Sequence, residues 1–394
     1  MMWQITNFIR PLHARDSNEN HRAATQLELF FDLVIVIAFA AIAKQLHHEL
    51  VDGHVTSGII HFIMAFILVW WPWNLFTWFA SSFDNDDMGY RMTVMVMMAG
   101  SMIIAAALPQ AMSSYDLTYV FIGYLVTRLA HVIMWFRVGR NNPKMRPMAN
   151  RYVAGQVLMQ SYWAIIVFML KPVGIMLYSL FVLGFAVELF IPRFAEKKHN
   201  TTWHRHHIVE RFGLLNIIVL GEVLLAATVA LKGAFSNIHV DWLLIGNSFC
   251  GIVIAFAMWW LYFADDKHIE NTKIRCPFRW AYGHVIVFST GVATGAGLEV
   301  MNAAFAHHGA GEHHAADPYI AAWAVSIPIA LYVVGLWYVR EIVTLSRNHG
   351  YTLLFIATLI ALSPLISTLP YLPTALIVLC VFIRQIKLKS HTNG

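Results

Sequence analysis

The chain has 394 residues, of which 58% are hydrophobic and only 12% are charged, and its mean hydropathy is +0.59. Soluble globular proteins carry about a quarter charged residues, so this composition excludes a soluble globular fold and predicts an all-α polytopic membrane protein. The formal net charge of +5 does not indicate nucleic-acid binding, because the basic residues lie between apolar segments rather than on one domain. The three cysteines lie far apart in the sequence and show no spacing typical of a disulfide framework or a thiolate metal site.

Residues 1–27 form a polar segment that contains Arg10, Arg15 and Arg22. They lack an apolar run followed by a small-residue cleavage site, so we do not expect a signal peptide. We predict a retained cytoplasmic N-terminal segment.

The first apolar segment begins with two carboxylates, Glu28 and Asp32, one helical turn apart on the same helix face. An ionised group in lipid costs several kcal/mol unless it is paired, hydrated or turned inward. We therefore interpret both residues as groups inside a helix bundle or a water-filled cavity. The alternative is a helix start in the membrane interface, where the helix dipole favours Glu28.

A membrane-spanning helix needs roughly 20 apolar residues, and by this criterion the sequence contains twelve candidate spans. They cover residues 28–48, 59–80, 91–110, 118–137, 153–170, 173–192, 208–231, 241–263, 280–302, 319–340, 351–369 and 371–388. The last two are the weakest, because Pro364, Pro370 and Pro373 crowd the link between them. A re-entrant hairpin there would reduce the number of spans to ten.

The positions of the 27 Lys and Arg residues predict the orientation. Most of them fall in alternate connectors, whereas only Lys44, Lys171 and Lys232 fall in the connectors of the opposite side. By the positive-inside rule, both termini of this multi-pass protein are expected in the cytoplasm.

Weak sequence similarities in the same order suggest an internal repeat. The second span ends in Trp78-Phe79-Ala80 before an acidic cluster, and the eighth ends in Tyr262-Phe263-Ala264 before another. An even number of spans per half predicts two parallel six-helix repeats. The expected domains are membrane repeats over 28–192 and 208–388, a basic and histidine-rich linker over 193–207, and a C-terminal tail over 389–394.

Few ionisable residues lie deep inside the predicted spans. Glu222 is 12 residues into the seventh span, near the middle of the membrane, and Arg128 has a similar depth with His131 one turn beyond it. A buried Arg beside a buried Glu forms a mutually neutralising pair, so we expect a contact between Arg128 and Glu222. Such a pair is either an element of an ion path or a device that fixes helix packing.

Glu188 and Glu210 lie near the predicted cytoplasmic ends of the sixth and seventh spans. With Glu28, Asp32 and Arg211 they would form an inner vestibule if the first and seventh spans face each other.

Phe30, Phe31 and Phe212 would then surround the path as a hydrophobic constriction that gates by dewetting. The alternative for these aromatic residues is core packing.

Polar clusters outside the spans have simpler interpretations. Asp84, Asp86 and Asp87 would cap helices or pair with Arg91, and the alternative is a funnel for cations. The cytoplasmic histidines, His207 among them, are interpreted as part of a basic interfacial loop.

A histidine-rich loop follows the ninth span, and its imidazoles could bind zinc, copper or nickel. The spacing is not that of a structural site, so adventitious binding is the alternative. The candidate ligands are His307, His308, His313 and His314.

Three long segments carry a family resemblance: ELFFDLVIVIAF at 28–39, WWPWNLFTWFASSFDNDD at 70–87 and ERFGLLNIIVLGE at 210–222. They resemble the bacterial low temperature requirement A family, which implies a multi-pass protein of the bacterial inner membrane without a settled biochemical activity. A fainter likeness is to the lysosomal potassium/proton channel family, which has two six-span repeats and a Phe-x-Asp motif with Ser between. Here Phe31 replaces that Ser, and the second half lacks the Asp after Phe212.

The preferred function is a channel or secondary transporter for a small ion, a cation or proton, along a path between the two repeats. A phosphate-binding loop, a nucleophile elbow and a zinc-protease motif are absent, and we expect neither an enzyme nor a cofactor. The alternatives are a non-transporting scaffold or membrane-stress protein and a membrane-embedded enzyme acting on lipid. The expected partners are the lipid bilayer and a small ion, with no nucleic acid and with a homodimer as an alternative to a monomer.

Overall fold

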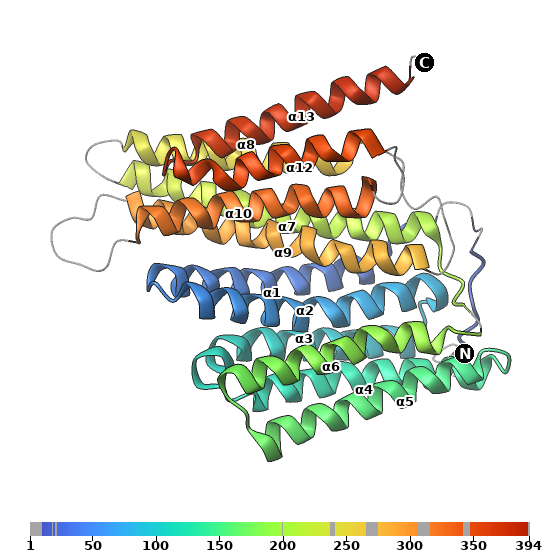
Figure 1. The fold of residues 1–394 in the computed structure, drawn as a ribbon. Coiled ribbons are helices and arrows are strands. Elements are labelled where there is room, and N and C mark those ends of the chain that lie inside the picture. Colours follow the sequence, from blue (N-terminus) through green and yellow to red (C-terminus); the bar gives the residue numbers. More distant parts are fainter. Residues whose placement is uncertain are drawn as a thin grey trace, which may run out of the picture. The chain divides into compact units, whose positions relative to one another are not determined.

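All regular elements in the described part of the chain are helical (Figure 1). The computed structural model describes residues 10–17, 19, 22–198, 200–236, 241–264, 275–305, 316–341 and 347–392. The α-helices are α1 (Gln26–Val51), α2 (Val55–Phe83), α3 (Met88–Ser114), α4 (Thr118–Asn141), α5 (Arg146–Ala164), α6 (Gly174–Ala195), α7 (Arg205–Ser236), α8 (Trp242–Phe263), α9 (Arg275–Phe305), α10 (Pro318–Leu336), α12 (Arg347–Leu362) and α13 (Tyr371–Thr392). π-helical segments, Ile165–Leu170 and Trp337–Glu341, continue α5 and α10, and a 3-10 turn, Ser363–Leu365, ends α12.

Ten of the described helices are long and apolar enough to cross a membrane, which confirms a multi-pass membrane protein. They are α1 to α10, with α5 and α10 counted together with their π-helical ends. The apolar parts of α12 and α13, Tyr351–Leu365 and Tyr371–Ile386, are shorter. The prolines between them end one helix and restrict the start of the next. The eleventh and twelfth spans therefore stay predictions.

The chain forms two compact units, and each unit combines two separate stretches of the sequence. Unit 1 contains Met1–Ala41 and Ile67–Arg211, and unit 2 contains Ile42–Phe66 and Phe212–Gly394. Helices α1, α2 and α7 contribute residues to both units. The domain boundaries predicted from the repeat stay predictions.

In unit 1, α3 packs closely on α4, α4 on α5, and α5 on α6. The close approach of α3 and α4 depends on two glycines: a Cβ atom at Gly100 would lie 2.7 Å from the carbonyl oxygen of Gly123, and one at Gly123 would lie 2.7 Å from that of Gly100. Large side chains of α2, among them Trp70, Trp71 and Trp73, are fully buried. Unit 1 is thus a tightly packed helical core that can hold buried polar groups in fixed positions.

In unit 2, α9 packs on α10, α10 on α12, and α8 on α13. A Cβ atom at Gly297 would lie 2.0 Å from the carbonyl oxygen of Ala324, so glycine permits the backbones of α9 and α10 to approach. Small residues have this role at helix contacts in membranes generally.

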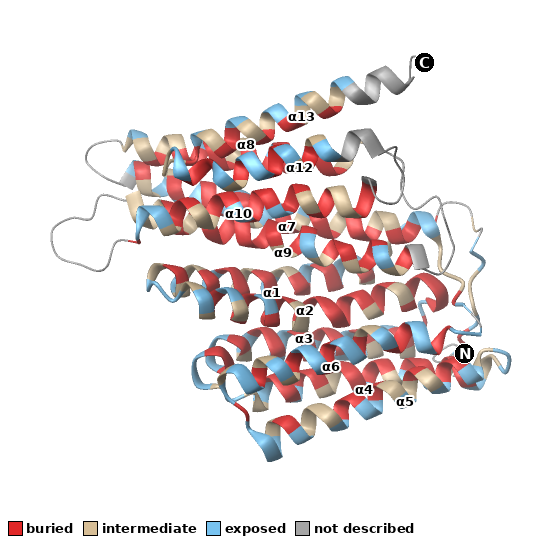
Figure 2. Ribbon diagram, viewed as in Figure 1, coloured by how far each residue is buried: buried red, intermediate tan, exposed pale blue. Residues whose placement is uncertain are grey.

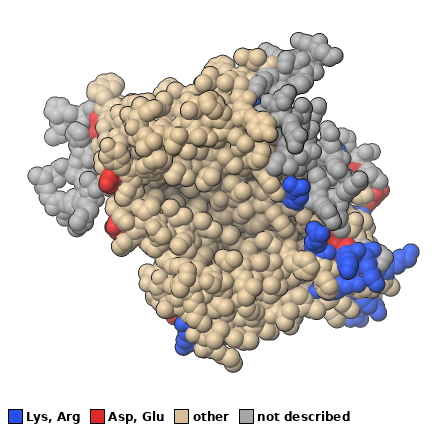
Figure 3. All heavy atoms as spheres, in the orientation of Figure 1, with Lys and Arg blue, Asp and Glu red and all other residues tan. Residues whose placement is uncertain are grey.

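Buried and exposed residues alternate along most helices, as Figure 2 shows, and many exposed residues are large and apolar. On the face drawn in Figure 3, charged side chains are confined to the ends and a broad uncharged band lies between them. Arg140, Lys144 and Arg146 are exposed around the connection from α4 to α5. An uncharged band between charged ends is the surface that a lipid bilayer requires.

Candidate functional site

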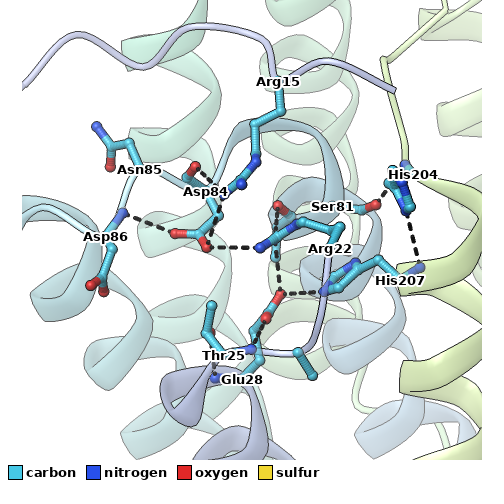
Figure 4. A network of polar contacts seen from close by, with 12 residues as sticks. Arg15, Arg22, Thr25, Glu28, Ser81, Asp84, Asn85, Asp86, His204 and His207 are labelled. Carbon is cyan, nitrogen blue, oxygen red and sulfur yellow. Dashed lines mark hydrogen bonds and ion pairs between the residues drawn. The ribbon is translucent and has the colours of Figure 1, made fainter. Parts of the chain in front are cut away.

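Unit 1 contains a group of ionisable side chains that are almost completely shielded from solvent, which we call the charge cluster. Its members come from the segment before α1, the first turns of α1, the end of α2 and the first turns of α7. They are Arg22, Glu28, Asp32, Asp84, His207 and Arg211. Figure 4 shows part of this network, including the contacts of Arg22 with Asp84 and of Glu28 with His207.

Glu28 is held at the start of α1 by a reciprocal capping arrangement. The backbone N–H of Thr25 donates to Glu28 Oε2 at 2.6 Å, and the backbone N–H of Glu28 donates to Thr25 Oγ1 at 3.3 Å. The sequence T-x-x-E is the signature of such a capping box. The other carboxylate oxygen of Glu28 lies 3.0 Å from His207 Nε2 and 3.6 Å from both Arg211 Nη1 and Arg22 Nη2. Local helix capping thus fixes Glu28 among three basic groups.

Asp32 lies one turn further along α1 and shares Arg211 with Glu28. Its Oδ1 atom accepts hydrogen bonds from Arg211 Nη2 and from Trp73 Nε1, each at 2.6 Å. Glu28, Asp32, His207 and Arg211 have a relative exposure of 0%. Both carboxylates of the first span are therefore turned inward, as the sequence predicted.

Asp84 connects the charge cluster to the N-terminal segment through Arg22 and Arg15. Its Oδ2 lies 3.5 Å from Arg22 Nη1 and 3.7 Å from Arg15 Nη1, and its Oδ1 accepts a hydrogen bond from the backbone N–H of Asp86 at 2.9 Å. Burial raises the pKa of the Asp84 carboxyl, and the negative charge of Glu28 raises it further. Protonation of Asp84 is therefore easier than that of an exposed aspartate.

The neighbouring acidic residues have the structural roles that we predicted for them. Asp87 caps α3 by accepting a hydrogen bond from the backbone N–H of Tyr90 at 2.6 Å, and it also pairs with Arg137 at 2.6 Å. Burial opposes ionisation of Asp87, yet the hydrogen bonds from Tyr90 and Arg137 hold its pKa below the usual range. Asp86 pairs with Arg91 at 2.5 Å.

Arg128 has a different partner from the expected one. Its Nη2 donates to Glu188 Oε1 at 2.6 Å, and both side chains are buried in unit 1. The indole N–H groups of Trp71 and Trp163 donate to the same carboxylate at 3.1 and 3.4 Å. The predicted Arg128–Glu222 contact is therefore wrong, and Glu188 belongs to this pair rather than to a vestibule with Glu28 and Asp32. The depth of a residue in a span does not reveal which way its side chain points.

Three other predicted site residues lie elsewhere. His131 is buried on α4, one turn from Arg128. Glu210 is half-buried and accepts a hydrogen bond from the backbone N–H of Ala24 at 3.2 Å, which places it at the edge of the charge cluster. Glu222 is half-buried on α7 within unit 2, where Glu299 of α9 is its acidic neighbour.

The three phenylalanines do not share one environment. Phe31 is fully buried and lies 4.9 Å from Phe76 between ring centres, whereas the Phe30 side chain is 52% exposed. Phe212 packs within unit 2 against Trp280 and His284. Phe30 therefore does not fit a constriction, because successive residues of a helix point in directions about 100° apart.

The histidine-rich loop with His307, His308, His313 and His314 lies outside the described residues. Among the residues that are described, no group of three or more His, Cys, Asp or Glu side chains could hold a metal ion.

A comparison with protein families decides the relationship of the chain. The family model described as bacterial low temperature requirement A protein (LtrA) matches residues 23–384. The chain belongs to the LtrA family. It is also similar to an uncharacterized protein, RA0937, of Rhizobium meliloti (strain 1021), with 26% identity over 301 residues that cover 72% of this chain and 70% of the relative. No solved structure matches the chain significantly.

Sequence reasoning missed two members of the charge cluster of this LtrA family member, Arg22 and His207, as well as the indole donor Trp73, which binds Asp32. His207 was interpreted as part of a basic loop, but α7 begins at Arg205 and includes it. The available signal was spacing, because His207 and Arg211 are four residues apart, as are Glu28 and Asp32. Two pairs with the same spacing and opposite charge can align along two helices.

Proposed function

We propose that the protein moves a small monovalent cation, above all the proton, across the membrane, and that the charge cluster is where the ion is bound. The proposal depends on one observation, the charge balance of buried groups. The cluster contains three carboxyl groups, those of Glu28, Asp32 and Asp84, but only two guanidinium groups, those of Arg22 and Arg211. One negative charge is left without a counter-charge when His207 is neutral.

A buried net charge is costly, so the cluster favours the uptake of one positive charge. A proton on His207, whose Nε2 lies 3.0 Å from Glu28, or a proton on one carboxyl would supply it. Arg15 does not change this balance, because it forms a salt bridge with Glu19 at 2.6 Å. Ionisable groups buried in membrane proteins commonly mark ion pathways and proton relays.

The membrane arrangement that we propose has both termini in the cytoplasm of the bacterial inner membrane and twelve spans in two parallel repeats. The positive-inside distribution supports the orientation. The repeat is supported by equivalent packing within each unit: α3 and α4 approach at glycines in unit 1, and α9 and α10 approach at a glycine in unit 2. These pairs are the third and fourth helices of the proposed repeats.

Proton flux into proteoliposomes tests the function. Purified protein is reconstituted with a pH-sensitive dye inside the vesicles, and a potassium gradient with valinomycin drives proton entry. We expect wild-type flux well above that of empty vesicles and loss of flux in Asp32→Asn, which keeps the shape of the side chain and removes its charge. We also expect loss of flux in Glu222→Gln, because a half-buried carboxylate with an acidic neighbour is a second protonation site in unit 2.

Asp87→Asn is the matched control, because Asp87 is a buried aspartate outside the charge cluster whose amide analogue can still cap α3. It should keep wild-type flux. Wild-type flux equal to that of empty vesicles for protons and for Na⁺ and K⁺, or undiminished flux in Asp32→Asn, would show that the cluster does not carry ions.

A further inference from the structure

Exposed positive charge is concentrated at the end of unit 1 where α4 connects to α5 and where α6 ends. We call this surface the basic patch. Its members are Arg140, Lys144, Arg146, Arg193, Lys197 and Lys198, and all six are exposed. Figure 3 shows Lys and Arg side chains gathered around this end of unit 1. None of the six forms a salt bridge with an acidic residue in the described part of the chain.

Hydrogen bonds of α5 bring the basic residues of α4 and α6 onto one surface. Arg146 Nε donates to the carbonyl oxygen of Gly139 at 3.0 Å, which joins the start of α5 to the end of α4. Arg151 Nη1, further along α5, donates to the carbonyl oxygen of Ala195 at 3.1 Å, which joins the same helix to the end of α6. All members of the basic patch lie within three residues of these contacts in the sequence. The patch is therefore continuous.

Negative charge is scarce around the basic patch. Residues 117–187, which contain α4, α5 and most of α6, include no Asp or Glu. Glu188 is buried and paired with Arg128, and Glu196 is buried and accepts a hydrogen bond from the Tyr152 hydroxyl at 2.8 Å. Neither carboxylate reaches the surface of the patch. A group of like charges repels itself and attracts a partner of opposite charge.

The basic patch lies at the ends of the two helices that face lipid most. In the most apolar stretches of α5 and α6, only 17% and 33% of the residues are buried, against 44% or more in the other eight candidate spans. Exposed apolar residues recur on α6 at intervals of four, three and four residues, which places them on one helix face. They are Leu183, Val187, Phe190 and Phe194. Arg193 lies three residues after Phe190, so this apolar face ends in positive charge.

We propose that the basic patch binds the phosphate groups of anionic phospholipids in the adjoining leaflet of the membrane. Lys and Arg are the side chains that bind phosphate, and clusters of about four to eight of them beside a membrane-spanning helix are typical of anionic-lipid binding. The exposed face of α6 adds an apolar surface for the acyl chains, which a soluble phosphate compound would not use. This surface lies outside the charge cluster, and the proposal does not depend on ion transport.

Native mass spectrometry of the full-length protein in detergent tests the proposal. The protein is titrated with phosphatidylglycerol and, separately, with phosphatidylcholine of the same acyl chains, and the Kd of the first bound lipid is measured. Each basic residue at a membrane surface changes the affinity for anionic lipid about fivefold. Lys144→Gln should therefore weaken phosphatidylglycerol binding about fivefold, and the double variant Lys197→Gln/Lys198→Gln roughly 25-fold. The weaker binding of phosphatidylcholine should stay unchanged in both variants.

Lys171→Gln is the matched control, because Lys171 is also an exposed lysine next to α5 but follows the other end of that helix and its π-helical extension. It should keep the wild-type Kd. All substituted side chains are exposed, so the variants should fold like the wild type. Inorganic phosphate at millimolar concentration should not displace the lipid. Equal affinity for the two lipids, equal weakening in Lys171→Gln and Lys144→Gln, or displacement by inorganic phosphate would show that the basic patch is not a surface for anionic lipid.

Discussion

Removing the positive charge from the Arg128–Glu188 pair should destabilise the protein far more than removing both charges together. Among the described residues, Arg128 and Glu188 form a salt bridge only with each other, which makes the free energy of the pair tractable. In Arg128→Met, the Glu188 carboxylate stays buried and keeps two neutral donors from the described part of the chain, Trp71 and Trp163. In Glu188→Gln, the Arg128 guanidinium keeps the Tyr124 ring, whose centre lies 4.9 Å from it.

Breaking a buried ion pair from one side costs about 3–5 kcal/mol, because an uncompensated charge remains. The two indole donors partly stabilise Glu188, and the cation–π contact contributes about 1–2 kcal/mol to Arg128, so each single variant should lose roughly 3 kcal/mol. The double variant Arg128→Met/Glu188→Gln leaves no buried charge and should lose about 1 kcal/mol. A double-mutant cycle should therefore give a coupling free energy of roughly 5 kcal/mol.

The assay is equilibrium unfolding in mixed micelles by SDS, followed by circular dichroism. The exposed pair Arg91–Asp86 is the matched control, with side-chain exposures of 55% and 50%, and its cycle should show no measurable coupling. Additive losses in the Arg128–Glu188 cycle, or a double variant as unstable as the singles, would refute the assignment of a buried, mutually dependent pair.

Three further expectations concern packing, capping and pH. Gly297→Ala should abolish a monodisperse peak in size-exclusion chromatography, because the new Cβ would lie 2.0 Å from the Ala324 carbonyl oxygen, whereas Gly221→Ala, with no atom within 4 Å, should elute like the wild type. Asp87→Ala should lower the free energy of unfolding by about 1–2 kcal/mol through loss of the α3 cap, and Asp87→Asn by clearly less; equal losses would contradict the capping role. The pKa of Asp87 is lowered in the folded state. The ionised Asp87 side chain therefore contributes its full stabilisation above the ordinary carboxyl pKa, and this stabilisation is lost as the pH falls through the lower pKa of the folded state. The unfolding midpoint of Asp87→Asn should consequently fall less steeply than that of the wild type below about pH 4, and parallel curves would argue against this linkage.

The helices were predictable because a membrane imposes both length and composition on each of them. The same argument placed Glu28 and Asp32 inside the protein, where the structure has them, since an unpaired charge facing lipid is too costly. The last two helices were harder to predict as membrane spans, because prolines shorten their apolar parts below the length that a membrane-spanning helix needs.

The partners of buried charges were not predictable, because a partner depends on the rotation of each helix as well as on depth. Arg128 and Glu222 have similar depths, yet Arg128 faces Glu188. Phe30 and Phe31 are neighbours in the sequence, but one is exposed and the other is buried. His207 looked like a loop residue because the apolar part of α7 starts only after it, although the helix itself already begins at Arg205.

The charge cluster also has a consequence for how the protein is made. Asp32 leaves the ribosome early, but its partner Arg211 follows 179 residues later. Arg22 is available from the beginning, whereas Asp84 and His207 appear only after the first two helices and the first six, respectively. The first helix must therefore enter the membrane while Asp32 still lacks its arginine partner, which is synthesised only with the seventh helix. We infer that, during biogenesis, α1 either stays at the insertion machinery or carries the Asp32 carboxyl in its protonated form until Arg211 has been synthesised.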